Sequence, residues 1–85
     1  MRLSDKQMAS IFGSIQRIEE GELNKLSAFN TLDQKEANIS KSSYFALVDK
    51  VLILKRLKAL DVDNNVIEDI AQQMGMYYIW KVYNQ

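Results

Sequence analysis

Hydrophobic residues recur at helical spacing along most of this chain, and short polar turns separate the stretches. In the first stretch, about residues 5–20, the apolar positions are Met8, Ile11, Phe12, Ile15 and Ile18. Ser4 and Gln7 have the spacing of a capping box, in which each side chain accepts a hydrogen bond from the other residue's backbone N–H. Gly21 can take the left-handed conformation that ends a helix. The pattern predicts an amphipathic helix with one buried stripe.

The next segment, residues 22–39, has two interpretations. Its apolar residues recur every three positions, which suits one helix with a drifting stripe; they are Leu23, Leu26, Phe29 and Leu32. Thr31 and Gln34 also have capping-box spacing, which would divide the segment into two short helices. The sequence leaves both interpretations open.

A long apolar helix is predicted over about residues 43–60, where twelve of eighteen residues are hydrophobic. One side carries Tyr44, Leu47, Val48, Val51 and Leu54, and another carries Ala46, Ile53, Leu57 and Leu60. Because no wide polar face remains, this helix must be covered on most sides. It is either the central helix of the domain or part of the contact with a second copy, and the pattern therefore favours a homodimer.

The C-terminal third predicts two further helices. Asp63 or Asn64 can cap a helix that runs to about Met74, and Gly75 can end it. A last helix is expected over about residues 77–84. No linker or internal repeat interrupts the 85 residues. The predicted fold is therefore a single all-α domain, residues 1–85, with four or five helices around the central one.

Composition removes most kinds of active site. The chain has no histidine and no cysteine, so the commonest general base and the thiolate metal ligands are missing. Neighbouring carboxylates such as Glu68 and Asp69 diverge by about 100° on a helix and do not converge on a substrate. Asp61, Asp63 and Asn65 resemble the opening of a calcium loop, but its required glycine and final carboxylate are missing. We expect no catalysis, no metal and no cofactor.

Charge and hydropathy narrow the possible partners. Eleven basic residues balance eleven acidic ones, whereas nucleic-acid-binding domains usually carry a basic excess. The N-terminus lacks the apolar region of a signal peptide, and no apolar run is long enough for a membrane span. These features predict a soluble, cytoplasmic protein.

Residues 64–84 partly match a DNA-binding helix-turn-helix. With Ala71 at the fifth position, Gly75 falls at the ninth, as the motif requires, and Met76 occupies an expected hydrophobic position. Two later hydrophobic positions, however, fall on Lys81 and Asn84. The positions that should face the DNA groove fall on Tyr77, Tyr78, Ile79, Val82 and Tyr83. These residues are mostly apolar, whereas base edges are recognised by polar side chains.

The C-terminal aromatic residues are the main candidates for function. We predict that they contact a protein partner or a second copy: Tyr77, Tyr78, Trp80 and Tyr83, with Val51 or Leu57 contributing from the long helix. The competing interpretation buries Ile79 and Trp80 in the core. The alternative function is a nucleic-acid-binding regulator, whose cations would be Lys50, Lys55, Arg56, Lys58 and Lys81. The favoured hypothesis is a small regulatory module that acts through protein–protein contact and self-association.

Overall fold

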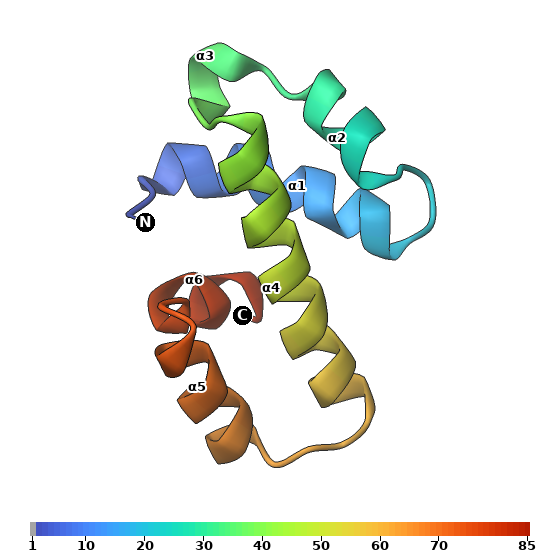
Figure 1. The fold of residues 1–85 in the computed structure, drawn as a ribbon. Helices are drawn as coiled ribbons and strands as arrows, with labels where there is room; N and C mark the ends of the chain where they lie inside the picture. Colours follow the sequence, from blue (N-terminus) through green and yellow to red (C-terminus); the bar gives the residue numbers. More distant parts are fainter. Residues whose placement is uncertain (1) are drawn as a thin grey trace. The chain divides into compact units, whose positions relative to one another are not determined.

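The all-α prediction is confirmed by the computed structural model, which describes residues 2–85 (Figure 1). Within these residues the elements are α1 (Asp5–Glu19), α2 (Lys25–Thr31), α3 (Gln34–Ala37), α4 (Lys41–Ala59), α5 (Asn64–Gln73) and α6 (Tyr77–Tyr83). Six helices replace the predicted four or five. The described contacts divide into two compact units, Arg2–Val48 and Asp49–Gln85, and α4 contributes to both. That the chain is a single domain stays a prediction.

In the unit Arg2–Val48, α1 begins at the predicted capping box. The backbone N–H of Gln7 donates to the Ser4 hydroxyl at 3.2 Å, and the N–H of Ser4 donates to Gln7 Oε1 at 3.0 Å. The Gln7 amide also donates to the backbone carbonyl of Ala37 at 3.0 Å, which ties the start of α1 to the end of α3. Gly21 has a φ of 80°, so it takes the predicted left-handed conformation after α1.

The ambiguous segment 22–39 forms two helices, but not at the box expected from the sequence. Asn24 caps α2 and exchanges hydrogen bonds with Ser27 in a capping box of its own. Thr31 lies inside α2, where its hydroxyl donates to the carbonyl of Ala28 at 2.9 Å. The interpretation of Thr31 as a cap is therefore wrong, since a cap must lie outside the helix and accept a bond. Asp33 caps α3 instead.

Tyr44, at the start of α4, is buried completely in the core of this unit. Its hydroxyl lies 2.7 Å from the Ser14 hydroxyl, which donates to the carbonyl of Ile11 at 2.6 Å. Its ring is 5.5 Å from the Phe29 ring, a common separation for aromatic pairs. Burial raises the pKa of the Tyr44 phenol, and the hydrogen bond with Ser14 opposes part of that rise. Tyr44 thus joins α1 through a satisfied polar contact and α2 through a ring contact, both inside an apolar core.

The unit Asp49–Gln85 contains the second part of α4 together with α5 and α6. Val51 and Leu54 of α4 are fully buried, as is Ala71 of α5. Asp63 caps α5 as predicted, accepting from the N–H of Asn65 at 2.8 Å. Gly75, with a φ of 71°, makes the turn between α5 and α6.

Candidate partner-binding surface on α5 and α6

The short helix α6 has one buried side and one exposed side. Ile79 and Trp80 are 4% and 2% exposed, whereas Tyr77 and Tyr78 are 43% and 61% exposed. Residues three and four apart share a helical face, so Tyr77, Tyr78 and Lys81 lie together on the outer side. The burial of Ile79 and Trp80 agrees with the interpretation of the sequence that places both residues in the core.

Two predicted contact residues belong to the core instead. Trp80 and Val51 are 2% and 0% exposed, so a partner cannot reach either side chain while the unit is folded. We correct the predicted contact set accordingly. Tyr83 is half-buried, with the Lys55 ammonium 5.9 Å from its ring centroid, and Leu57 is half-buried. Tyr77 and Tyr78 are the exposed members of the predicted set.

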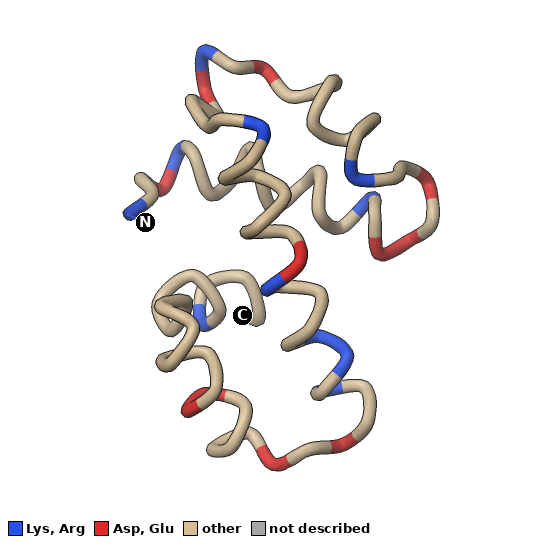
Figure 2. The backbone as a smooth tube through the Cα atoms, in the orientation of Figure 1, with Lys and Arg blue, Asp and Glu red and all other residues tan. Residues whose placement is uncertain are grey.

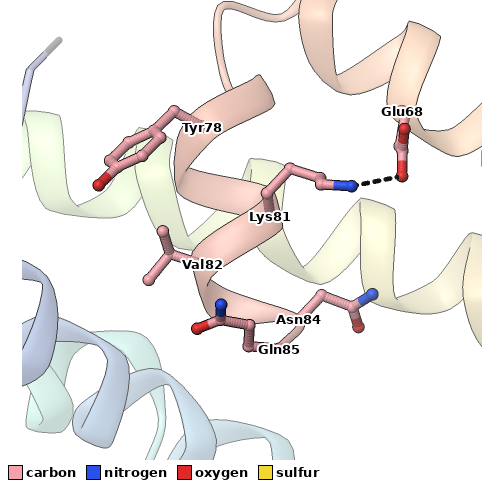
Figure 3. A pocket seen from close by; sticks show the side chains of 6 residues that line it. All are labelled: Glu68, Tyr78, Lys81, Val82, Asn84 and Gln85. Atoms are coloured by element: carbon pink, nitrogen blue, oxygen red, sulfur yellow. Dashed lines mark hydrogen bonds and ion pairs between the residues drawn. The ribbon is translucent and has the colours of Figure 1, made fainter.

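A hollow of about 460 Å³ lies beside Tyr78, as Figure 3 shows. Its lining residues come from α5, α6 and the chain end: Glu68, Tyr78, Lys81, Val82, Asn84 and Gln85. Tyr78 and Val82 supply apolar surface, and the other four supply charges or amides. Glu68, Asn84 and Gln85 were not predicted as site residues, and Glu68 reaches the hollow only because the turn at Gly75 brings α5 alongside α6.

An ion pair crosses between α5 and α6 at this hollow. Lys81 Nζ lies 3.1 Å from Glu68 Oε2, and the two side chains are 49% and 32% exposed. The hydrogen bond from Lys81 to Glu68, followed by the attraction of the Glu68 charge, raises the pKa of the Lys81 ammonium. The same ammonium is 5.9 Å from the Tyr77 ring centroid. Lys81 is therefore held between a carboxylate and an aromatic face.

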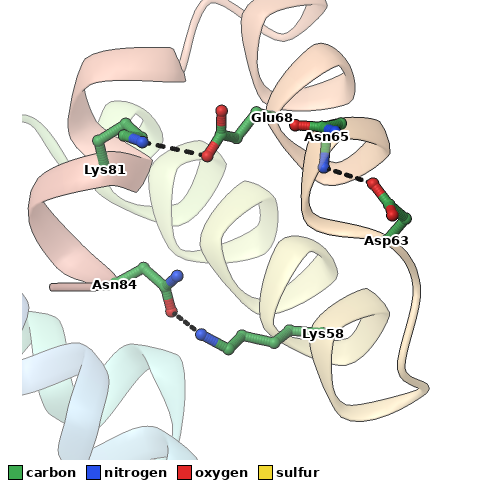
Figure 4. A network of polar contacts seen from close by, with 6 residues as sticks. All are labelled: Lys58, Asp63, Asn65, Glu68, Lys81 and Asn84. Carbon is green, nitrogen blue, oxygen red and sulfur yellow. Dashed lines mark hydrogen bonds and ion pairs between the residues drawn. The ribbon is translucent and has the colours of Figure 1, made fainter.

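Most of the cations predicted for nucleic-acid binding make contacts inside their own unit. Lys58 donates to Asn84 Oδ1 at 2.9 Å, as Figure 4 shows. Lys50 donates to the carbonyl of Met74 at 3.5 Å, near the C-terminal end of α5. Lys55 lies beside Tyr83, and Lys81 is bonded to Glu68. Arg56 is exposed. Four of the five cations thus connect α4, α5 and α6 rather than forming an open phosphate-binding patch.

The charges in this unit balance. Residues 49–85 contain five basic and five acidic side chains. In Figure 2 basic residues lie along the part of α4 that belongs to this unit, and acidic residues follow on the connecting turn and α5. A phosphate backbone would meet both signs of charge, so the electrostatic attraction that dominates nucleic-acid binding is weak here.

The turn between α5 and α6 has the left-handed glycine that the helix-turn-helix pattern requires, but α6 buries residues that do not fit that pattern. Gly75 is left-handed, and the N–H of Met76 donates to the carbonyl of Ala71 at 2.7 Å. In that motif the Lys81 position should be buried, yet its side chain is 49% exposed. Ile79, at an expected groove-facing position, is buried. The left-handed glycine therefore agrees with the motif, whereas the DNA-facing side does not.

Residues 2–85 contain neither a cluster of metal ligands nor a helix able to span a membrane. Asp63 is used as a helix cap, and no group of three or more acidic residues in positions 2–85 is arranged to hold a metal ion. Each helix in this part of the chain is too short or too polar to span a bilayer.

Comparison with protein-family models, curated proteins and solved structures gives no match. Function must therefore be argued from the residues themselves.

Proposed function

We propose that this protein is a non-catalytic binding module that contacts a partner protein through the α5–α6 surface. This surface is defined by Glu68, Tyr77, Tyr78, Lys81 and Val82. The observation that carries the proposal is the 61% exposure of Tyr78 beside the hollow that Val82 and Lys81 also line. Self-association is a separate part of the proposal and uses another surface, described below.

The physical case rests on what an exposed tyrosine offers to a partner. Tyrosine carries a large apolar ring with few rotatable bonds, so it loses little conformational entropy on binding, and its hydroxyl can still form hydrogen bonds. Two adjacent tyrosines on α6 double this area. The Glu68–Lys81 pair constrains the neighbouring charges and reduces the entropy lost on complex formation.

The shape and chemistry of the hollow favour a protein over a small molecule. Small-molecule sites are usually enclosed and mostly apolar, with a few polar groups. Here only Tyr78 and Val82 supply apolar side chains, and the other lining residues are charged or carry amides. Such a mixed surface is typical of the contact between two folded proteins.

The proposal is tested by capture and substitution. Wild-type protein on a solid support is exposed to a lysate of the source organism beside the variant Tyr78→Ala. The control is Leu26→Ala, since Leu26 is 48% exposed on α2 and lies in the other unit. A partner that uses the α5–α6 surface should bind the Tyr78 variant at least about tenfold more weakly, as for a central interface residue, and the Leu26 variant normally.

Titration calorimetry with the purified partner then measures the affinity directly. Equal loss in both variants, or loss in neither, contradicts the assignment of this surface. Circular dichroism of each variant verifies that the helices are intact.

One observation favours the nucleic-acid alternative: the left-handed Gly75 turn between α5 and α6. Its test is fluorescence anisotropy with generic double- and single-stranded DNA at low salt. Binding that falls steeply as salt rises, and that weakens in Lys55→Glu/Arg56→Glu, would replace the protein-binding proposal. We expect little binding to DNA, because Lys50, Lys58 and Lys81 already contact groups within their own unit.

A further inference from the structure

A second apolar surface lies on α4, and we call it the α4 stripe: Ile53, Leu57 and Leu60. Ile53 and Leu60 are 49% and 63% exposed, and Leu57 is half-buried. At 100° per residue these three positions fall within about 60° of one another around the helix axis. Successive turns of α4 and the residue that follows it therefore present a continuous apolar line.

The exposed residues of the α4 stripe, Ile53 and Leu60, face away from α6 and the chain end, and the half-buried Leu57 lies at the edge of the stripe. Val51, Lys55 and Lys58 project about 140–160° from Ile53 around the helix axis. Val51 is fully buried, Lys55 lies beside Tyr83 and Lys58 bonds to Asn84, so this opposite side packs against α6 and the chain end. Binding at the α4 stripe and binding at the α5–α6 surface can therefore fail independently.

The charges that flank Ile53 have the pattern needed for pairing with a second copy. Asp49 lies four residues before Ile53 and Arg56 lies three residues after it, both on exposed positions of the same side. Their midpoint falls between residues 52 and 53. A two-fold axis at that point, perpendicular to an antiparallel pair of α4 helices, places each Asp49 opposite the Arg56 of the other copy.

We propose that a second copy of this chain docks antiparallel on the α4 stripe, with Ile53 against Ile53 and two reciprocal Asp49–Arg56 ion pairs. A symmetric dimer requires one patch to complement itself, and the α4 stripe with its opposite flanking charges does so. Parallel pairing would instead place Arg56 against Arg56. Because a carboxylate accepts several hydrogen bonds, Asp49 can join this pair while keeping contacts within its own chain.

The dimer should be weak. The segment 49–60 is about 18 Å long, and a single helix pair of that length buries less than the roughly 1,600 Å² of a standard interface. A dissociation constant of roughly 10–500 μM follows for such a small contact. Light scattering from about 10 μM to about 1 mM should therefore show the mass rise from 9.8 kDa toward twice that value.

Charge substitutions test the antiparallel register. Asp49→Arg and Arg56→Asp should each raise the dissociation constant about tenfold, because each change turns both ion pairs into repulsions. The double variant Asp49→Arg/Arg56→Asp restores opposite charges and should return the constant to within about threefold of wild type. Failure of the double variant to recover, or a monomer at every concentration up to about 1 mM, overturns the proposal.

Cysteine cross-linking tests the contact itself, and the chain has no native cysteine to interfere. Ile53→Cys should form a disulfide-linked dimer much faster than Tyr78→Cys on mild oxidation. Arg56→Cys should also be slow, because the two residues 56 are about 10 Å apart along the helix axes of an antiparallel pair. A fastest reaction at Arg56→Cys indicates parallel pairing, and equal rates indicate random collision; either result overturns the proposal.

Discussion

At the scale of single residues, the buried phenol of Tyr44 links the stability of this protein to alkaline pH. Burial raises its pKa above the ordinary value of 10.0, and the hydrogen bond with Ser14 offsets only part of that rise. The folded state therefore holds the phenol proton more tightly than the unfolded state. The resulting stability is fully present below about pH 10 and is lost as pH rises through the folded pKa.

We expect the free energy of unfolding to fall above pH 10 by up to about 1.4 kcal/mol per pH unit because of Tyr44. Tyr44→Phe removes the ionisable group, so its unfolding free energy should be less sensitive to pH in this range. Ser14→Ala, the matched control, loses the hydrogen bond at a cost of about 1 kcal/mol but keeps the phenol and the pH dependence. Urea unfolding at several values above pH 9 measures all three; equal slopes for wild type and Tyr44→Phe would contradict the expectation.

At the scale of elements, the helix ends that were predicted correctly have local signals, although the local caps at Asn24 and Asp33 were missed. Ser4 and Asp63 cap their helices through hydrogen bonds to residues two or three positions away. Gly21 and Gly75 follow helices in a left-handed conformation, which depends on one backbone angle. The Thr31 box failed because a hydroxyl inside a helix can donate backward to the preceding turn, and sequence spacing does not distinguish the two uses.

The buried side of α6 was left open between two interpretations for a different reason. Nearly all of its residues are apolar or aromatic, so its pattern has no polar side to orient it. The choice of Ile79 and Trp80 for the core depends on what α4 and α5 present, and the Gly75 turn sets that arrangement. Trp80 was predicted as a contact residue in one interpretation and as a core residue in the other, and the packing places it in the core.

The end of α4 offers a test of backbone strain. Asp61 follows the helix with a φ of 64°, a left-handed conformation that glycine adopts without steric cost. The N–H of Val62 donates to the carbonyl of Leu57 at 3.1 Å, so this conformation is required to close the helix end.

We expect Asp61→Gly to raise the free energy of unfolding by up to about 1 kcal/mol, which is a rise in Tm of about 4–8 °C for a chain of this size. Asp61→Ala should lower the Tm, because alanine tolerates this conformation less well than aspartate does. Thermal unfolding followed by circular dichroism compares the three proteins. A glycine variant no more stable than the alanine variant would show that φ at residue 61 carries no strain.

At the scale of the whole molecule, the two units share one helix. The unit Asp49–Gln85 has 37 residues, and a helical unit of fewer than about 40 residues rarely folds alone without a disulfide, a metal or a partner. Because α4 runs through Val48 and Asp49 without a break, helix formation in either unit extends the helix that the other one needs. This continuity is the reason that a single domain remains our prediction.

We therefore expect the two units to unfold together. Trp80 is the only tryptophan and lies in the core of Asp49–Gln85, so its fluorescence reports that unit, whereas circular dichroism at 222 nm reports the helices of both. The two signals should give the same urea midpoint, and the isolated segment 49–85 should be largely unfolded. A fluorescence transition at distinctly lower urea would mean that Asp49–Gln85 unfolds as a separate domain. The proposed dimerisation would stabilise the folded chain, so both midpoints should also rise together with protein concentration. A rise lost in Ile53→Glu but kept in Tyr78→Ala would connect that stabilisation to the α4 stripe and leave the α5–α6 surface available to a partner.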